Sequence, residues 1–170
     1  MKKLSWYIRK ELLIKDNTAE RLSGGYLEKA RANLITMELL SKATAFRKSL
    51  ALPEDYCPDE WVVITAYYAM YMAALACLAK LGYRSKNHAA TIAALEEFIV
   101  KKKLLERKYL EALNKIKLKK EEIENLNIVR DRREIAQYSV TKETTREIVE
   151  KTKKDARKFV DRFEELLDLL

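Results

Sequence analysis

Glycine and proline are scarce in this chain, which has three glycines and two prolines among its 170 residues. Sandwiches, barrels and alternating α/β folds need frequent turns, where these two residue types are common. The length is that of one ordinary domain, and a domain of this size buries a core without disulfides or metal ions. The composition therefore predicts an all-α fold.

Cysteine and histidine are also scarce, since the chain has only Cys57, Cys77 and His88. These are too few for a zinc site of the usual kind, and no Glu-x-x-His motif indicates a carboxylate metal centre. No framework of spacings indicates a disulfide, so we expect two free thiols in a reducing cytoplasm. Charged residues interrupt the apolar stretch near the N-terminus, which argues against a signal peptide. The sequence thus predicts a cytoplasmic protein that needs no cofactor and no metal ion.

Glutamine occurs once, at Gln137, whereas lysine and glutamate are abundant. This balance is associated with proteins from hot environments. It suggests a thermophilic source and says nothing about activity.

One apolar run, residues 61–79, is long enough to be tested as a membrane span, with Thr65 as its only clearly polar side chain. Alanine, tyrosine and methionine dominate the run, strongly lipid-preferring residues are few, and charged amphipathic stretches surround it. We therefore expect the central helix of a bundle core and no association with a membrane.

The net charge of +8 is concentrated in residues 101–133, where twelve basic and six acidic residues give a net +6. Such a stripe attracts polyanions, nucleic acid above all, through a sequence-independent term that weakens with salt. A long exposed helix in a protein rich in lysine and glutamate has the same appearance. Charge alone does not separate these two interpretations.

The spacing of apolar residues predicts a succession of helices joined by short connections. Gly24 and Gly25 indicate a break, Pro53 and Pro58 end the helix before them, and Gly82 ends the next one. Ser85 is the expected N-cap of the helix that follows. The predicted helical segments are 4–15, 26–50, 59–81, 87–100, 104–134 and 143–169. Helices of this length with brief connections pack most simply as an antiparallel up-and-down bundle of four to five helices, preceded by a short N-terminal helical extension.

Three tyrosines of the sequence AYYAMY, Tyr67, Tyr68 and Tyr71, have the aromatic character of stacking platforms for bases. Tyr68 shares a helical face with Trp61 and apolar residues, so we expect it in the core. Tyr67 and Tyr71, four residues apart, share another face and are candidates to line an interface or a groove.

His88 lies in the first turn of the helix predicted for 87–100, where the helix dipole disfavours an imidazolium. A neutral imidazole N–H there can bind a phosphate or a nucleobase. The alternative is a structural role, in which His88 orders the start of the helix or packs beside the loop. We expect the structural role and keep His88 as a candidate ligand-binding residue.

The segment RDRREIAQYSV, residues 130–140, places Arg130, Arg132 and Arg133 around an aspartate and continues to Gln137 and Tyr138. An arginine cluster of this kind suits phosphate because guanidinium groups bind oxyanions with two parallel hydrogen bonds. It is also what the solvated end of a helix looks like. From the residues alone, this arginine motif is a site for an anion such as RNA, a disabled version of one, or exposed surface.

Several stretches taken in order resemble the HEPN domains, small helical bundles of bacteria and archaea. The stretches are YLEKARANL from residue 26, AYYAMYMAALACLAKLGYRSKNHAATIAALEEF, RREIAQYSV and the closing DARKFVDRFEELL. The block with AYY, LGY, SK and a histidine is the most specific part. Because the resemblance leaves the N-terminal residues aside, we expect an extension over 1–22 and a HEPN-like domain over 23–170.

The resemblance implies a bundle that is often a homodimer and is sometimes encoded beside a minimal nucleotidyltransferase, as in toxin–antitoxin pairs. Active relatives carry an arginine, a short spacer, a histidine and a tyrosine, and cleave RNA without metal. In this chain the matching positions are Arg132 or Arg130, then Gln137, then Tyr138. A carboxamide binds a phosphate or ribose but cannot exchange a proton near neutral pH. In two-component relatives the partner attaches adenylate to the motif tyrosine, which would be Tyr138.

Three functions follow, and we favour the first: a non-catalytic dimeric module that binds RNA, a nucleotide or a nucleotidyltransferase partner. Its ligand-binding residues would be Arg130, Arg132, Arg133, Gln137, Tyr138 and His88. The second is a metal-independent ribonuclease toxin, with Arg132 and Tyr138 as catalytic residues only if the protein is active. The third is a scaffold or oligomerisation bundle whose arginines form surface ion pairs.

Overall fold

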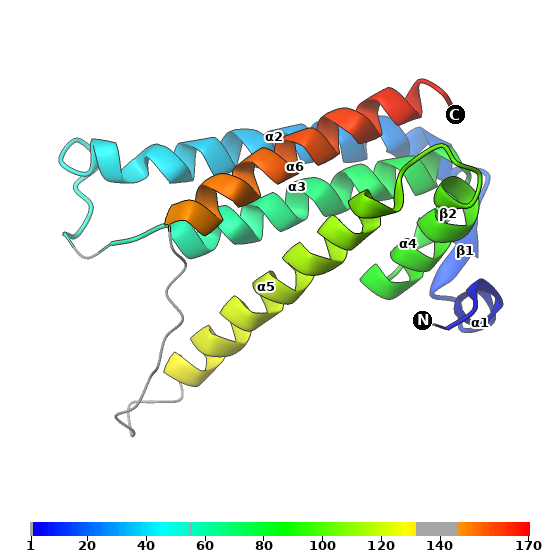
Figure 1. Cartoon of the computed structure of the whole chain (residues 1–170), viewed down its shortest axis with the longest axis horizontal. Helices are drawn as coiled ribbons and strands as arrows, with labels where there is room; N and C mark the ends of the chain where they lie inside the picture. Colours follow the sequence, from blue (N-terminus) through cyan, green and yellow to red (C-terminus); the bar gives the residue numbers. More distant parts are fainter. Residues whose placement is uncertain (1, 55, 132–145) are drawn as a thin grey trace.

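The computed structural model describes residues 2–54, 56–131 and 146–170, with the backbone alone for 125–131. Four long helices form the bundle, and α1, α4 and a small two-stranded sheet gather at one end of it (Figure 1). The long helices are α2 (Ser23–Lys42), α3 (Asp59–Lys80), α5 (Arg107–Asp131) and α6 (Arg146–Leu167). The short elements are α1 (Leu4–Arg9), β1 (Leu13–Lys15), η1 (Ala19–Leu22), η2 (Ala43–Phe46), β2 (Tyr83–Ser85), α4 (His88–Leu95) and the π-helical turn η3 (Glu96–Val100). The all-α up-and-down bundle predicted from the sequence is confirmed.

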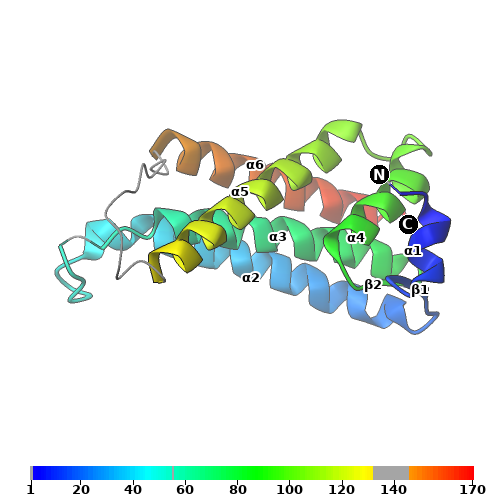
Figure 2. The same ribbon diagram turned by 90° about the horizontal axis from the view of Figure 1, so that it is seen from below.

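Helix α3 is the centre of the fold and packs against α2, α5 and α6 (Figures 1 and 2). Its residues are buried on nearly every side, which explains why its sequence is apolar throughout. Among the described residues α3 is also the one helix long and apolar enough to cross a membrane, and 78% of its most apolar window is buried inside the protein. That burial is typical of a core helix, as the sequence predicts.

Helix α6 completes the core with one apolar face. Phe159 and Phe163 on this face stack with ring centroids 4.2 Å apart, and neither is accessible to solvent beyond 1%. The buried residues of this face are Val149, Thr152, Ala156, Phe159, Val160, Phe163 and Leu166. Salt bridges from Arg157 and Lys153 to Glu38 link α6 to α2 at the edge of this interface.

Helices α5 and α6 both pack against α3 and diverge from each other toward the C-terminal end of α5 and the N-terminal end of α6 (Figure 1). Near the other end, Nη2 of Arg162 donates a hydrogen bond of 3.1 Å to the carbonyl of Leu104, just before α5 begins. The two helices are therefore joined at one end and separated along the rest of their length.

A two-stranded antiparallel sheet, which the sequence does not predict, joins the N-terminal segment to the turn after α3. Leu13 pairs with Ser85 and Lys15 with Tyr83, and Leu13 is completely buried. The predicted helix over 4–15 is therefore wrong in its second half. A strand of three residues is too short to show the alternation of apolar and polar residues from which strands are predicted.

Three predicted boundaries also change. Gly24 and Gly25 lie inside the first turn of α2 instead of in a break, and α2 ends at Lys42 rather than near residue 50. The N-cap of α4 is Asn87, whose Oδ1 accepts a hydrogen bond of 2.8 Å from the N–H of Ala90. Ser85 belongs to β2 instead. Gly82 follows the end of α3 with a φ of 78°, the left-handed conformation that favours glycine, as predicted.

Candidate functional site

The arginine motif begins within the last turn of α5, which contains Arg130 and ends at Asp131. Of Arg130 the structure describes the backbone only. Arg132, Arg133, Gln137 and Tyr138 lie outside the described residues. The structure therefore describes α5, which leads to the motif, and the helices that pack against α5.

Acidic neighbours neutralise part of the basic stripe that runs along α5. Two lysines pair within the helix at the i, i+4 spacing that favours such contacts, Lys117 with Glu121 at 2.7 Å and Lys120 with Glu124 at 2.6 Å. Around the start of the helix, carboxylates likewise lie within 4 Å of Lys101, Arg107 and Lys108. Over the part of this stripe whose side chains are described, the basic residues without such a partner are Lys102, Lys103, Lys115 and Lys119.

His88 is the first residue of α4 and is buried, with 9% of its surface exposed. Its Nε2 lies 3.2 Å from Oδ1 of Asn114 in α5. An amide oxygen only accepts hydrogen bonds, so the imidazole carries its proton on Nε2. Nδ1 is buried and has no hydrogen-bond partner among the described residues. Burial lowers the pKa of His88 below its usual value, against the opposing effect of the Asn114 hydrogen bond. His88 is therefore a neutral imidazole near pH 7.

Two tyrosines of α3 extend the His88 cluster as a stack of rings. Tyr67 and Tyr71 lie with centroids 5.6 Å apart and nearly parallel, and Tyr71 stacks on His88 at 5.7 Å. Burial raises the pKa of both phenols above the usual value, so both stay protonated. Since their faces are occupied by one another and by His88, these rings pack within the protein.

Tyr68 is exposed, with 37% of its surface accessible, and Trp61 is more so at 55%. The prediction that Tyr68 packs in the core is therefore wrong, and Tyr67 takes that place instead. When a helix is apolar on all sides, the spacing of its apolar residues does not show which face is buried. The ammonium of Lys120 lies over both neighbouring rings, 5.5 Å from the centroid of Tyr67 and 5.8 Å from that of Tyr68.

His88 and Arg130, the first residue of the arginine motif, are far apart within one chain. His88 contacts α5 at Asn114, and Arg130 lies sixteen positions further along the same helix. At a rise of about 1.5 Å per residue, that separation is about 24 Å along the helix axis. Proton transfer needs hydrogen-bond contact or a single intervening water. His88 is therefore out of reach of a phosphate held at Arg130.

The described side chains around α5 offer positive charge but no group placed to transfer a proton at Arg130. Among the described residues, no group of three or more histidine, cysteine, aspartate or glutamate side chains could hold a metal ion. The contact of Asn114 with His88 was not foreseen, because nothing in the sequence relates residues on two separate helices. The i, i+4 spacing of Lys115 and Lys119 is visible in the sequence, although their lack of acidic partners is not.

The comparisons with known proteins give one match. The model of the HEPN domain matches residues 36–166, which include α3, α4, α5 and most of α6. A comparison with curated proteins finds no match, and neither does a comparison with solved structures. The family match covers well over half of the chain and agrees with the helical bundle described above. The chain therefore belongs to the HEPN domain family.

Proposed function

We propose that this protein is a HEPN domain that binds RNA or nucleotides through its arginine motif and does not cleave RNA. The observation that carries the proposal is Gln137 at the motif position where active relatives have histidine. Cleavage of RNA without metal needs a group that takes the 2′-hydroxyl proton or protonates the leaving oxygen. A glutamine side chain does neither, whereas Arg130, Arg132 and Arg133 keep the ability to bind phosphate.

The position of the only histidine supports the lack of catalysis. His88 is buried, neutral and about 24 Å along α5 from Arg130. It therefore does not replace the missing motif histidine within its own chain. Tyr138, with an ordinary tyrosine pKa of about 10, is a poor general base at neutral pH.

The charge of α5 supports binding of a polyanion. Lys115 and Lys119 add positive charge along the helix that leads to the motif, and no carboxylate among the described residues lies within 4 Å of either. Backbone phosphates interact with such charges regardless of base sequence, and the affinity falls as salt rises. His88 is a ligand contact in this proposal only if a nucleotide reaches the α4–α5 junction.

The proposal also includes the assembly state. We expect a homodimer that brings two arginine motifs together, and a minimal nucleotidyltransferase as a second partner. Sedimentation analysis of the purified chain tests the first expectation. Intact mass after incubation with ATP and the protein encoded next to this one tests the second, because one adenylate group on Tyr138 would increase the mass of the chain.

The decisive experiment measures binding and cleavage on the same samples of single-stranded RNA. We expect salt-sensitive binding by the native protein, weaker binding by Arg132→Ala, and no cleavage by either. Arg21→Ala is a matched control, because it removes one exposed arginine from η1, outside the motif. Cleavage that Arg132→Ala or Tyr138→Phe abolishes would instead identify a ribonuclease. Absence of salt-sensitive binding would refute the proposal.

A scaffold is the second candidate, and the ion pairs of α5 favour it. Lys117 and Lys120 already have glutamate partners on their own helix, so part of the basic stripe is neutralised without a ligand. If the arginine motif is neutralised in the same way, Arg132→Ala and Arg21→Ala will change RNA binding equally. Dimerisation without any nucleotide or RNA affinity is the outcome that selects this function.

A further inference from the structure

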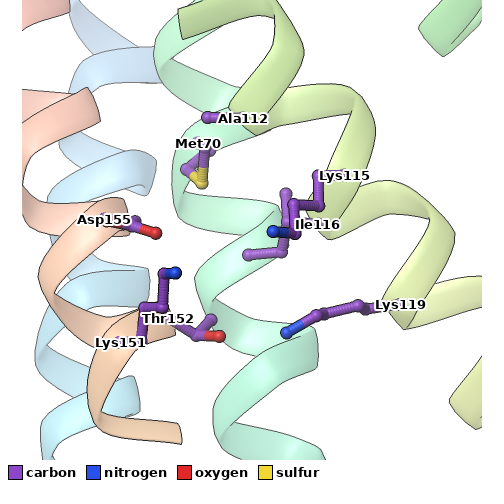
Figure 3. Close-up of a pocket in the computed structure, with 8 residues that line it drawn as sticks. All are labelled: Met70, Ala112, Lys115, Ile116, Lys119, Lys151, Thr152 and Asp155. Atoms are coloured by element: carbon purple, nitrogen blue, oxygen red, sulfur yellow. The ribbon is translucent and has the colours of Figure 1, made fainter. Parts of the chain in front are cut away.

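A small cavity lies between α5 and α6, with α3 as its floor (Figure 3). Its volume is about 90 Å³, room for a few water molecules or one small oxyanion. The lining residues are Met70, Ala112, Lys115, Ile116, Lys119, Lys151, Thr152 and Asp155.

Three ammonium groups point toward this one cavity. Lys115 and Lys119 reach it from successive turns of α5, and Lys151 reaches it from α6 (Figure 3). Within the part of the chain that the structure describes, none of the three has a carboxylate oxygen within 4 Å. The intervening Lys117 is paired with Glu121. The cavity therefore gathers the lysines of this surface that lack an acidic partner.

The three ammonium groups repel one another because they carry like charges. The apolar cavity walls increase the free-energy cost of keeping these charges close together. Burial lowers the pKa of Lys119 below its usual value, and the charges of Lys115 and Lys151 lower it further, against the opposing charges of Asp155 and Glu122. Met70, Ala112 and Ile116 supply apolar walls, which reduce the water available to hydrate the charges. A bound anion would relieve this repulsion, because it interacts favourably with all three amines at once.

Two oxygen-bearing side chains of α6 define which anion fits. Thr152 is buried, with 6% of its surface exposed, and it lines the cavity together with Lys119 (Figure 3). A hydroxyl can donate a hydrogen bond to an oxyanion. Asp155 also lines the cavity, and an ionised carboxylate only accepts hydrogen bonds. A ligand that satisfies both must carry negative charge together with an acidic O–H.

We propose that this cavity is a binding site for one protonated phosphate group, either inorganic phosphate or the terminal phosphate of a monoester. The monoester must take up a proton from solution when it binds near neutral pH, because its second pKa is about 6. Lys115, Lys119, Lys151 and Thr152 donate to its oxygens, and Asp155 accepts from its P–OH. Sulfate and the internal phosphodiesters of RNA lack that proton at neutral pH, so Asp155 disfavours them. The volume admits a phosphate group but not a nucleoside, since pockets for larger ligands measure about 300 Å³ or more.

This site is separate from the arginine motif and does not depend on the proposed function. Lys119 and Arg130 are eleven positions apart on α5, or about 16 Å along the helix. A protein that failed to bind internal RNA phosphates at the motif would still bind inorganic phosphate here.

The test is calorimetric titration of the full chain with inorganic phosphate at constant ionic strength, with sulfate and chloride titrated in parallel. We expect saturable binding of phosphate and much weaker binding of sulfate. Lys119→Gln and Lys151→Gln should each weaken phosphate binding by about tenfold, the change expected when one charge-assisted hydrogen bond is lost. Thr152→Val keeps the side-chain shape and should weaken it less, because a neutral hydrogen bond contributes less.

Matched control variants distinguish phosphate binding in the cavity from a general effect of the positive charge of the protein. Lys102→Gln and Lys154→Gln each remove one exposed positive charge away from the cavity and should leave phosphate affinity unchanged. Asp155→Asn should improve sulfate binding and reduce the preference for phosphate. Equal losses in control and cavity variants, equal binding of sulfate and phosphate by the native chain, or no phosphate binding at all would each overturn the proposal.

A second arm distinguishes the two sources of the phosphate group. A short oligonucleotide with a 5′-phosphate is compared with the same oligonucleotide ending in a 5′-hydroxyl. Tighter binding of the 5′-phosphate form, lost in Lys119→Gln, assigns a terminal monoester to the site. Binding of inorganic phosphate with no preference between the two oligonucleotides assigns free phosphate. Both results support the cavity as a phosphate site, and they differ only in the source.

Discussion

The Nε2 atom of His88 lies 3.2 Å from Oδ1 of Asn114, and this contact joins the start of α4 to the middle of α5. It is a hydrogen bond between neutral groups in a partly buried position, with the ring of Tyr71 stacked on the buried imidazole. A charged imidazole there would lose hydration without gaining an acidic partner in contact. The contact therefore depends on His88 staying neutral, which makes it sensitive to pH.

The first prediction concerns stability between about pH 7.5 and pH 5.5, on either side of the ordinary histidine pKa of about 6.5. Burial lowers the pKa of folded His88, so the unfolded chain takes up a proton at a higher pH than the folded chain does. The free energy of unfolding must then fall as the pH is lowered through this window. Urea unfolding at the two pH values measures the fall.

Replacement of the histidine provides the control for this pH dependence. His88→Gln keeps an N–H that can donate to Asn114 and removes the titrating group. Because His88 is the only histidine of the chain, the variant should lose most of the pH dependence in this window. Carboxylates such as Glu38, whose pKa its lysine and arginine partners lower, contribute equally to both proteins. An identical pH dependence in native chain and variant would show that His88 does not cause it.

The second prediction concerns the two thiols, which differ in exposure. Cys57 is exposed and Cys77 is buried in α3, and burial raises the pKa of Cys77 to about 12. Only a thiolate reacts rapidly with disulfide reagents, so one thiol per folded chain should react and two per unfolded chain. Cys57→Ser should leave the folded protein without a reactive thiol. Rapid labelling of that variant would mean that α3 opens to solvent in the native state.

The third prediction concerns the stacked pair Phe159 and Phe163 in the core. Phe163→Ala removes a ring that is completely buried and should reduce the free energy of unfolding by about 3–5 kcal/mol. Phe46→Ala is the matched control, because Phe46 is 58% exposed and its loss leaves no cavity. Chemical denaturation of both variants measures the difference. Similar losses in the two would indicate that the α3–α6 interface is not the main source of stability.

The sequence predicts the helical elements better than their rotation about their own axes. Helix α6 has a single apolar face, so its spacing identifies its buried residues almost completely. Helix α3 is apolar all round, so the same reasoning selects Tyr68 for the core, whereas the structure buries Tyr67. The inward face of such a helix depends on the shapes of its neighbours, which one helix's sequence does not contain.

Sites formed by several helices are predicted only in part, for a related reason. The arginine motif is contiguous in sequence, so its residues are found together whatever the fold. The cavity between α5 and α6 combines Lys119 with Lys151, residues that become neighbours only because α3 holds both helices. Likewise, the spacing near His88 predicts a helix start, but the identity of its partner Asn114 depends on tertiary packing.

The pairing of β1 with β2 has a consequence for how this chain folds during synthesis. Leu13 of β1 pairs with Ser85 of β2, so this pairing forms only after residue 85 has been synthesised. The N-terminal segment leaves the ribosome earlier and therefore stays unpaired until α2, α3 and the turn after them have been made. Closing a loop of this length costs entropy that the completed helix pair offsets. Until then, the apolar residues of the N-terminal segment have no place to pack. We therefore expect the first fifteen residues to acquire protection from hydrogen exchange together with the start of α4, later than the α2–α3 hairpin.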